Sequence, residues 1–588
     1  MHSLGEDTIA GWKVAVFFTL ATVLYIGSSF VPVIFDETEG QYAGAAREML
    51  ARNDWLIPTN DGIPRLQKPP VMYWIMMASC KIFGVNVFAA RLPNALASLL
   101  WIYATYLVGK RVGGRSTGYY AAIIQSTFFG FFIFSHLIMP EPFLGALLTL
   151  TFWCFLSALT HPARCRRWFD LAWLCMSLAC VVKGLHGLLY PVLVAALCML
   201  FFERQRKVWR EMWRLRHLAI FLLIVAPWYA AIEMRFSGFL MDHFVNEQVG
   251  HLLDKRFPPD SRAVPSMVFW VQHLVFFLPW TLFAPAVFWA RRRIKETGQV
   301  FYHHEKVLWL WVVVTAVSII FSARQDYYTM TSWGGVAIWL ALPWAARIQV
   351  PRMFWLIPCV LLLVCGVLGL ALQGVIDSAV KGATVEVDPV AARDNALNAI
   401  RGFSFGGYLQ LVPLMKLASV ILMVGGGVGT YQAWRRRKAS VATVAGIGML
   451  GLMALASWGL ALMGQYFSLE GVARGIRNEA RPGAMVICQG EPHYATSLFF
   501  YLENPINWVD AHPGGEFALR EKGIGAELYL THDKVAECWK SERQVFLIIE
   551  QESLEFWREK LFLVPAQTRA VGVSGTRVAI MNRPGNSS

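Results

Sequence analysis

The chain has 588 residues, of which 56% are hydrophobic and only 16% are charged. Soluble domains carry about 25% charged residues, so this composition excludes an ordinary soluble protein and indicates a membrane protein. The net charge of +14 does not indicate a nucleic-acid partner, because the cations gather in short runs between apolar segments, as in cytoplasmic loops.

Apolar runs of spanning length predict about thirteen transmembrane helices. They lie near residues 12–34, 89–109, 117–135, 142–160, 168–182, 186–202, 217–233, 265–290, 307–322, 329–346, 353–373, 409–433 and 440–464. The first run lacks a small-residue cleavage site, so we expect it to be retained as a span.

Every second loop between these runs is basic. The six basic runs lie at 110–115, 164–167, 204–216, 291–295, 347–352 and 435–438. With thirteen spans they fall on one side, which predicts an inner-membrane protein with a cytoplasmic N-terminus and a C-terminus outside.

The first outer loop, residues 35–73, combines acids with two short helices. Asp36, Glu37 and Glu39 follow the first span directly. The pattern predicts an amphipathic helix over 39–52, and the apolar run 71–84 is too short to span, so both are expected to lie at the outer face.

The character of the chain changes after about residue 466. Short strand-like runs at 484–490, 506–510 and 544–550 alternate with helical stretches, which is typical of a small α/β domain. The predicted organisation is a transmembrane catalytic module (1–345), further transmembrane helices (346–466) and an extracytoplasmic, periplasmic α/β domain (467–588).

The outer loops also carry unusual ionisable residues. Glu141 and Lys183 flank apolar helices, where a charge is costly unless it faces a cavity or a partner. Cations on the same face as carboxylates suit the binding of a phosphate and the acceptance of a proton from an attacking hydroxyl.

Several motifs together resemble the GT-C membrane glycosyltransferases, in particular the aminoarabinose lipid A transferase and protein O-mannosyltransferase group. They are an acidic pair after the first span, YAxxAREML at 42–50, NDW at 53–55, Lys-Pro-Pro at 68–70, FGxNxFAARLPNAL at 83–96, an acid at 141 and Lys-Gly at 183–184. The resemblance is close over roughly the first 345 residues and extends to the rest only in layout.

The resemblance implies a glycosyltransferase that moves a sugar from a polyprenyl-phosphate donor to a lipid A/LPS-type or other cell-envelope acceptor, a lipid or a protein, with no required cofactor. A divalent metal is left open. The implied site residues are catalytic Asp36, Glu39 and Glu141; Lys68, Arg256, Lys183, Arg324 and Tyr328 at the donor phosphate; and Tyr42, Arg65 and His251 at the substrate.

The chain departs from the family pattern at two positions. The family Asp stands four residues before the helix tyrosine, where this chain has Thr38, so either Asp36 or Glu39 is expected to be the base. Gln67 stands where the aminoarabinose enzymes carry Glu, which weakens a metal site and the lipid A assignment. The alternative to a catalytic role is a structural one, in which Asp36 and Glu39 cap the N-terminus of helix 39–52.

The rival function from another class is a transporter or lipid flippase. That function predicts charged or broken positions near the middle of paired spans and an internal repeat. The polar residues here sit at outer helix ends, which favours the enzyme.

Overall fold

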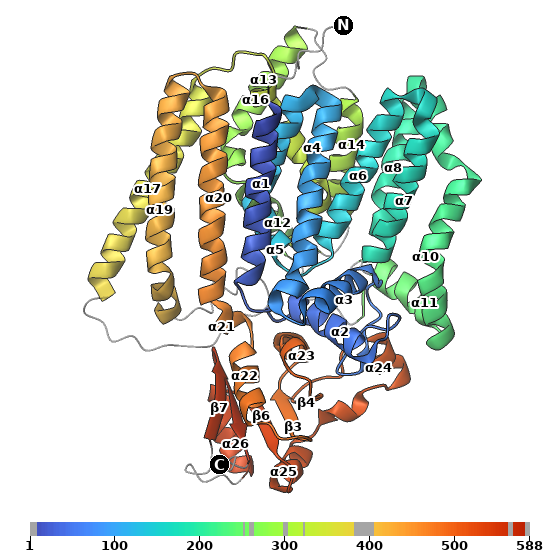
Figure 1. The fold of residues 1–588 in the computed structure, drawn as a ribbon, viewed down its shortest axis with the longest axis vertical. Helices are drawn as coiled ribbons and strands as arrows, with labels where there is room; N and C mark the ends of the chain where they lie inside the picture. The colour runs from blue at the N-terminus through green and yellow to red at the C-terminus, as the bar shows by residue number, and fades with distance from the viewer. Residues whose placement is uncertain are drawn as a thin grey trace.

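The computed structural model describes residues 9–250, 253, 255–257, 264–297, 304–320, 324–380, 405–561 and 569–582. A bundle of long helices carries a small sheet domain at one end (Figure 1). That end of the bundle is called the domain face below.

Each predicted apolar run is mostly helical over its described residues. The bundle helices are α1 (Gly11–Gly27), α4 (Val87–Ser126), α5 (Phe129–His136), α6 (Glu141–Thr160), α7 (Cys165–Lys183), α8 (His186–Phe201), α10 (Leu215–Arg235), α12 (Ser266–Phe276), α13 (Ala284–Glu296), α14 (Glu305–Ile320), α15 (Trp333–Leu340), α16 (Leu342–Ala345), α17 (Met353–Val380), α19 (Phe405–Trp434) and α20 (Lys438–Leu462). The second and third runs merge in α4, which breaks at Gly113 and Gly114. Gly114 has φ +85°, a conformation that residues with a Cβ rarely adopt.

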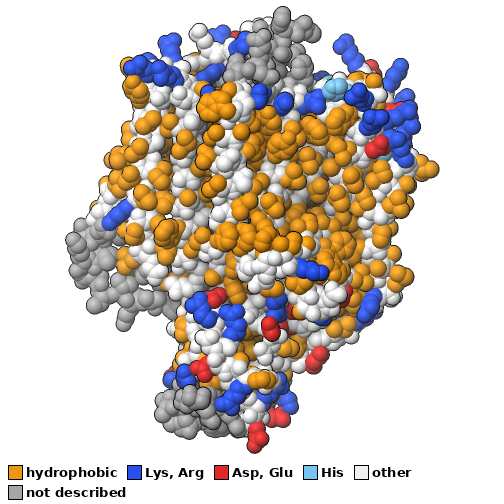
Figure 2. All heavy atoms as spheres, in the orientation of Figure 1, with side chains coloured by type: hydrophobic (Ala, Val, Ile, Leu, Met, Phe, Trp, Pro, Cys, Tyr) orange, Lys and Arg blue, Asp and Glu red, His pale blue; other side chains and the backbone are white. Residues whose placement is uncertain are grey.

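Length and apolarity identify seven of the described helices as able to cross a membrane, or nine if two bent pairs each count as one span. On the face seen in Figure 2, hydrophobic side chains cover the middle of the bundle, and most Lys and Arg lie toward its two ends. The chain is therefore a polytopic helical membrane protein, and the number thirteen stays a prediction.

Basic runs that are distant in sequence meet in the structure. Arg166 pairs with Glu211 at 2.7 Å, and Arg216 pairs with Asp170 at 2.8 Å. These contacts join the runs at 164–167 and 204–216, as expected for loops on one side of a membrane.

Two short helices form a layer between the bundle and the sheet domain: α2 (Thr38–Arg52) and α3 (Val71–Phe83). Between them lies a short hairpin of β1 (Thr59–Asn60) and β2 (Ile63–Pro64). Both helices were predicted, but α2 is more enclosed than a helix lying on a membrane surface. The reason is that the sheet domain packs on it through α23 (Leu498–Tyr501).

Glycines of α2 make this close packing possible, and Gly40 offers a test. A Cβ on Gly40 would lie 2.3 Å from the carbonyl carbon of Thr496, a backbone atom that cannot move aside cheaply. We expect Gly40→Ala to lower the free energy of unfolding by about 1–3 kcal/mol, measured by thermal unfolding in detergent. Gly27→Ala is the control, because a Cβ there meets nothing within 4 Å; equal effects would contradict the prediction.

The sheet domain contains one mixed sheet with the strand order β5-β4-β3-β6-β8-β7. Its strands are β3 (Met485–Gln489), β4 (Ile506–Val509), β5 (Tyr529–Leu530), β6 (Val545–Glu550), β7 (Arg569–Ser574) and β8 (Arg577–Met581). The first four strands in this order pair in parallel, and β8 and β7 are antiparallel. Helices α22 (Glu470–Glu479), α24 (Phe517–Lys522), α25 (His532–Lys540) and α26 (Leu554–Leu561) complete the predicted α/β domain.

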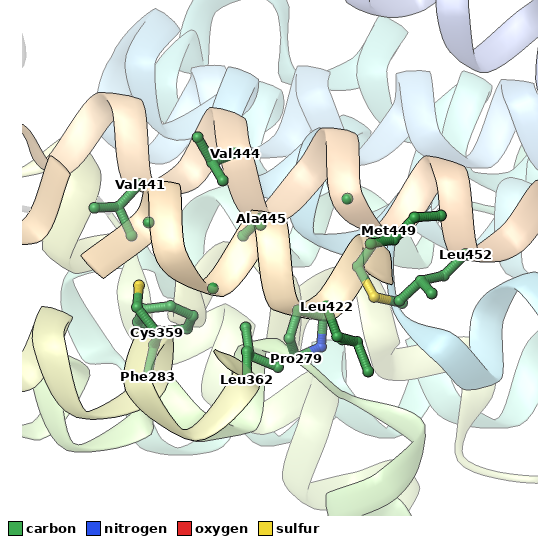
Figure 3. A pocket seen from close by; sticks show the side chains of 15 residues that line it. Pro279, Phe283, Cys359, Leu362, Leu422, Val441, Val444, Ala445, Met449 and Leu452 are labelled. Atoms are coloured by element: carbon green, nitrogen blue, oxygen red, sulfur yellow. The ribbon is translucent and has the colours of Figure 1, made fainter. Parts of the chain in front are cut away.

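An apolar cavity of about 30 Å³ lies between α17, α19 and α20, and the segment before α13 also lines it through Pro279 and Phe283. Figure 3 shows Val441 and Met449 of α20 on one side of it and Phe283, Leu362 and Cys359 on the other. A space of this size holds only one or two waters, so it is a packing gap and not a groove for a lipid chain.

Candidate functional site

Glu39 lies in a saturated buried ion pair. Glu39 is only 1% exposed. One carboxylate oxygen accepts hydrogen bonds from Arg91 Nε and the Ile138 N–H, both at 2.9 Å. The other accepts from Arg91 Nη2 at 2.6 Å and from the Phe35 N–H at 2.9 Å. The carboxylate therefore ties the first outer loop to α4 and to the loop before α6.

Asp36 lies at the contact between the first outer loop and the sheet domain. Its Oδ1 accepts a hydrogen bond from the Ser497 N–H at 2.8 Å, and its own N–H donates to the Phe467 carbonyl at 2.7 Å. The adjacent Glu37 carbonyl accepts from the Thr496 hydroxyl at 2.9 Å. Asp36 is thus bound into the domain contact.

Glu141 and Lys183 form a buried pair at the domain face. Glu141 is the first residue of α6 and is 2% exposed; one of its oxygens accepts a hydrogen bond from the Lys183 ammonium. Oε2 is buried, and no hydrogen-bond partner among the described residues reaches it. Lys183 Nζ also lies 5.5 Å and 5.2 Å from the ring centres of Tyr327 and Tyr328. The pair therefore presents one unpaired carboxylate oxygen beside a held cation.

A second charged group surrounds Lys68. Arg256 pairs with Glu247 at 2.8 Å. Burial acts to raise the pKa of the Glu247 carboxyl, but the charges of Lys68 and Arg256 outweigh it and hold that pKa below its ordinary value. Burial, assisted by Lys68, lowers the pKa of His243 to about 4, so this imidazole is neutral at pH 7. Two cations and a carboxylate thus lie together, and the two cations could bind an anion such as a phosphate.

Arg65 connects the two charged groups. It is buried, donates to Gln41 Oε1 at 2.8 Å and to the Tyr73 hydroxyl, and lies 4.6 Å above the ring of Tyr42. The charge of Glu141 in turn acts on Tyr42. The predicted residues Glu141, Lys183, Tyr42, Arg65 and Lys68 are therefore brought to one region of the domain face.

The loop that follows α7 is attached to the same region by Gln248. Its side-chain oxygen accepts a hydrogen bond from the Leu185 N–H at 3.2 Å. A Cβ on Gly184, which has φ +88°, would lie 2.9 Å from the Gln248 amide nitrogen. The Lys-Gly motif at 183–184 thus combines a charged side chain with a turn that admits Gln248.

Glu516 of the sheet domain also reaches this region. Burial raises the pKa of its carboxyl to about 7, against the charges of Arg65, Arg256 and Lys68. Nothing in the sequence of its loop distinguishes this acid from the many other acids of the domain. Only the docking of two segments some 450 residues apart along the chain reveals it.

Two predicted site residues remain, Arg324 and His251. Arg324 donates through Nε to the Val264 carbonyl at 3.1 Å, which joins the loop after α14 to the segment before α12. His251 lies outside the described residues. Within the described parts of the chain, no three His, Cys, Asp or Glu side chains are placed to hold a metal ion.

Comparison with known families gives one match. The family model described as "Dolichyl-phosphate-mannose-protein mannosyltransferase" matches residues 67–230. This segment includes Lys68, Glu141 and Lys183.

Curated relatives match over somewhat less than half of the chain. An undecaprenyl phosphate-alpha-4-amino-4-deoxy-L-arabinose arabinosyl transferase of Pseudomonas aeruginosa is 30% identical over 44% of this chain. One from Pseudomonas fluorescens is 28% identical over 47% of it. The match spans about half the length of these relatives, 47% and 49% respectively.

Among solved structures, the crystal structure of ArnT from Cupriavidus metallidurans bound to undecaprenyl phosphate has a TM-score of 0.79. It is 21% identical and covers 98% of this chain and 99% of that chain. The apo state of the same protein gives a TM-score of 0.78. The predicted resemblance to this group is confirmed, and so is the predicted fold class, a GT-C fold with a C-terminal α/β domain.

Proposed function

We propose that the chain is a glycosyltransferase that moves a sugar from a polyprenyl-phosphate donor to a cell-envelope acceptor at the domain face. The observation that carries the proposal is the buried Glu141 carboxylate, which has one oxygen held by Lys183 and the other without a hydrogen-bond partner in the described parts of the chain. An unpaired buried oxygen costs free energy, and a substrate hydroxyl that donates to it removes that cost.

The donor phosphate would bind at Lys68 and Arg256. When the bond from the anomeric carbon to the phosphate oxygen breaks, negative charge grows on the departing lipid phosphate. The two cations beside Glu247 would stabilise this charge more in the transition state than in the ground state, and that difference is what lowers the barrier.

Glu141 would accept the proton of the attacking acceptor hydroxyl. This role needs a carboxylate oxygen with a free acceptor position near the substrate. Oε2 of Glu141 has one, whereas both oxygens of Glu39 are saturated and Oδ1 of Asp36 holds the Ser497 N–H. Of the three predicted acids, Glu141 is therefore our choice for the base.

The proposed location is the inner membrane, with the N-terminus in the cytoplasm and the sheet domain outside. The alternation of basic loops supports this orientation. The names of the curated relatives favour a lipid-linked aminoarabinose donor, and the description of the family model favours mannose and a protein acceptor. Both are retained as donors and acceptors to test.

The test is a transfer assay with purified full-length protein in lipid nanodiscs. Undecaprenyl phosphate carrying labelled aminoarabinose or labelled mannose is supplied with lipid A or with a membrane-protein fraction. A labelled product with either acceptor supports the proposal. Movement of the donor across the bilayer without any product would instead support the flippase.

The donor cations provide a separate prediction. We expect Lys68→Ala to weaken the binding of undecaprenyl phosphate by roughly tenfold or more, because a hydrogen bond to a charged group contributes about 1.5–3 kcal/mol. Isothermal titration in detergent micelles measures it. Lys81→Ala is the matched control, since Lys81 is an exposed lysine of α3 on the same face. Unchanged affinity in Lys68→Ala would place the phosphate elsewhere.

A further inference from the structure

The sheet domain inserts part of its surface into the candidate site. Phe517 packs in an apolar cluster with Leu66 of the first outer loop and Trp228 and Phe239 of the bundle. Next to it, Arg520 pairs with Asp242 at 2.5 Å. An apolar anchor and an ion pair, three residues apart along the chain, thus hold α24 on the bundle.

Glu516 immediately precedes this anchored helix. Its Oε2 is buried and has no hydrogen-bond partner among the described residues. No ion pair within 4.0 Å is found for Glu516 in the described part of the chain either, although the charges of Arg65, Arg256 and Lys68 act on its carboxyl. The Glu516 side chain therefore lies near these cations but forms no ion pair with any of the three.

The position of this oxygen determines which ligand it suits. The cations attract the phosphate, whereas a carboxyl oxygen does not accept a hydrogen bond from a phosphate diester. The sugar is bonded directly to that phosphate, and its hydroxyl or ammonium groups are hydrogen-bond donors. An unpartnered acceptor beside a phosphate site is complementary to the sugar and not to the lipid.

We propose that Glu516 of the sheet domain is a specificity-determining residue of the donor site, which accepts a hydrogen bond from a hydroxyl or amino group of the transferred sugar. This inference rests on the proposed function. It gives the sheet domain a direct part in substrate selection: the domain completes, from the opposite side, a site whose phosphate cations come from the outer loops of the bundle.

The charge state of Glu516 is compatible with this role. When Glu516 is neutral, it adds no negative charge beside the cations Arg65, Lys68 and Arg256. Since the pKa of Glu516 is raised to about 7, its carboxyl is partly protonated near neutral pH. It can therefore lie beside a bound phosphate without full charge repulsion.

The experiment compares binding of a bare and a sugar-loaded lipid to the full-length protein in nanodiscs. The probes are undecaprenyl phosphate, undecaprenyl phosphate-aminoarabinose and undecaprenyl phosphate-mannose. We expect Glu516→Ala to weaken the better-bound sugar lipid about tenfold and to change the bare lipid by less than twofold. Glu516→Gln, which keeps the shape and one acceptor oxygen, is expected to lose less. Glu527→Gln, an exposed acid of the same domain, should change neither.

Each remaining outcome overturns the inference. Equal weakening of bare and sugar-loaded lipid by Glu516→Ala would mean a general or structural role, and no weakening would mean that the sugar lies elsewhere. If the wild-type protein transfers sugar but Glu516→Ala does not weaken a sugar-loaded lipid more than the bare lipid, this inference fails and the proposed function stands. If the wild-type protein binds none of the three lipids, the proposed function fails with it.

Discussion

Glu141→Gln is expected to lower the rate of sugar transfer by about 10²- to 10⁴-fold, the range that general base catalysis contributes. Glutamine has the same shape and can still accept the hydrogen bond from Lys183, but it cannot take up the acceptor proton. Binding of the donor lipid should change by less than twofold. Single-turnover kinetics with a labelled donor, together with a binding isotherm, separates the two effects.

Asp36→Asn is the competing variant, because Asp36 is one of the two acids that the sequence predicts as the base. Asparagine retains an oxygen that can accept from the Ser497 N–H, so transfer should stay within about fivefold of wild type. Loss of turnover in Asp36→Asn with near-normal turnover in Glu141→Gln would return the catalytic role to the first outer loop and contradict our assignment.

Arg91→Met is expected to lower the free energy of unfolding by about 3–5 kcal/mol, because it leaves the Glu39 carboxylate buried and unpaired. Arg91 is 2% exposed, and besides both Glu39 oxygens it donates to the Val33 carbonyl at 2.6 Å and to the Pro32 carbonyl. Methionine fills a similar volume without supplying any of these bonds. Thermal unfolding of detergent-purified protein measures the loss.

A double-mutant cycle that combines Arg91→Met with Glu39→Gln measures the coupling free energy between Arg91 and Glu39. The double variant should be more stable than Arg91→Met alone, because a neutral amide costs less to bury than an unpaired carboxylate. The folded fraction of Glu39→Gln should keep its turnover. Additive losses would show that the two residues are not coupled, and a folded but inactive Glu39→Gln would make Glu39 the base.

The sheet domain contacts the bundle at several places near the charged region. Asp36 bonds to Ser497, Gly40 packs on Thr496, and Arg520 pairs with Asp242. These contacts surround the charged region on the domain face. Because they attach the first outer loop and the π-helix at Asp242–Gly250 to the same domain, they position Lys68 and Glu247 relative to each other.

The sequence by itself determined the membrane class, the helical runs, the two short helices at 39–52 and 71–84 and the α/β character after residue 466. Each of these follows from local composition and periodicity, which act over a few turns of chain. It also identified Lys68, Glu141 and Lys183, since a charge at the end of an apolar helix stands out in the sequence and the motifs around it resemble a known family.

Only the tertiary structure decided how the acids differ from one another. Asp36, Glu39 and Glu141 are alike in sequence, and what separates them is the partner each one meets: Ser497, Arg91 or Lys183. Glu516 acquires its place in the site in the same way. Hydrogen bonding and burial depend on contacts between segments far apart along the chain, and no local pattern encodes those contacts.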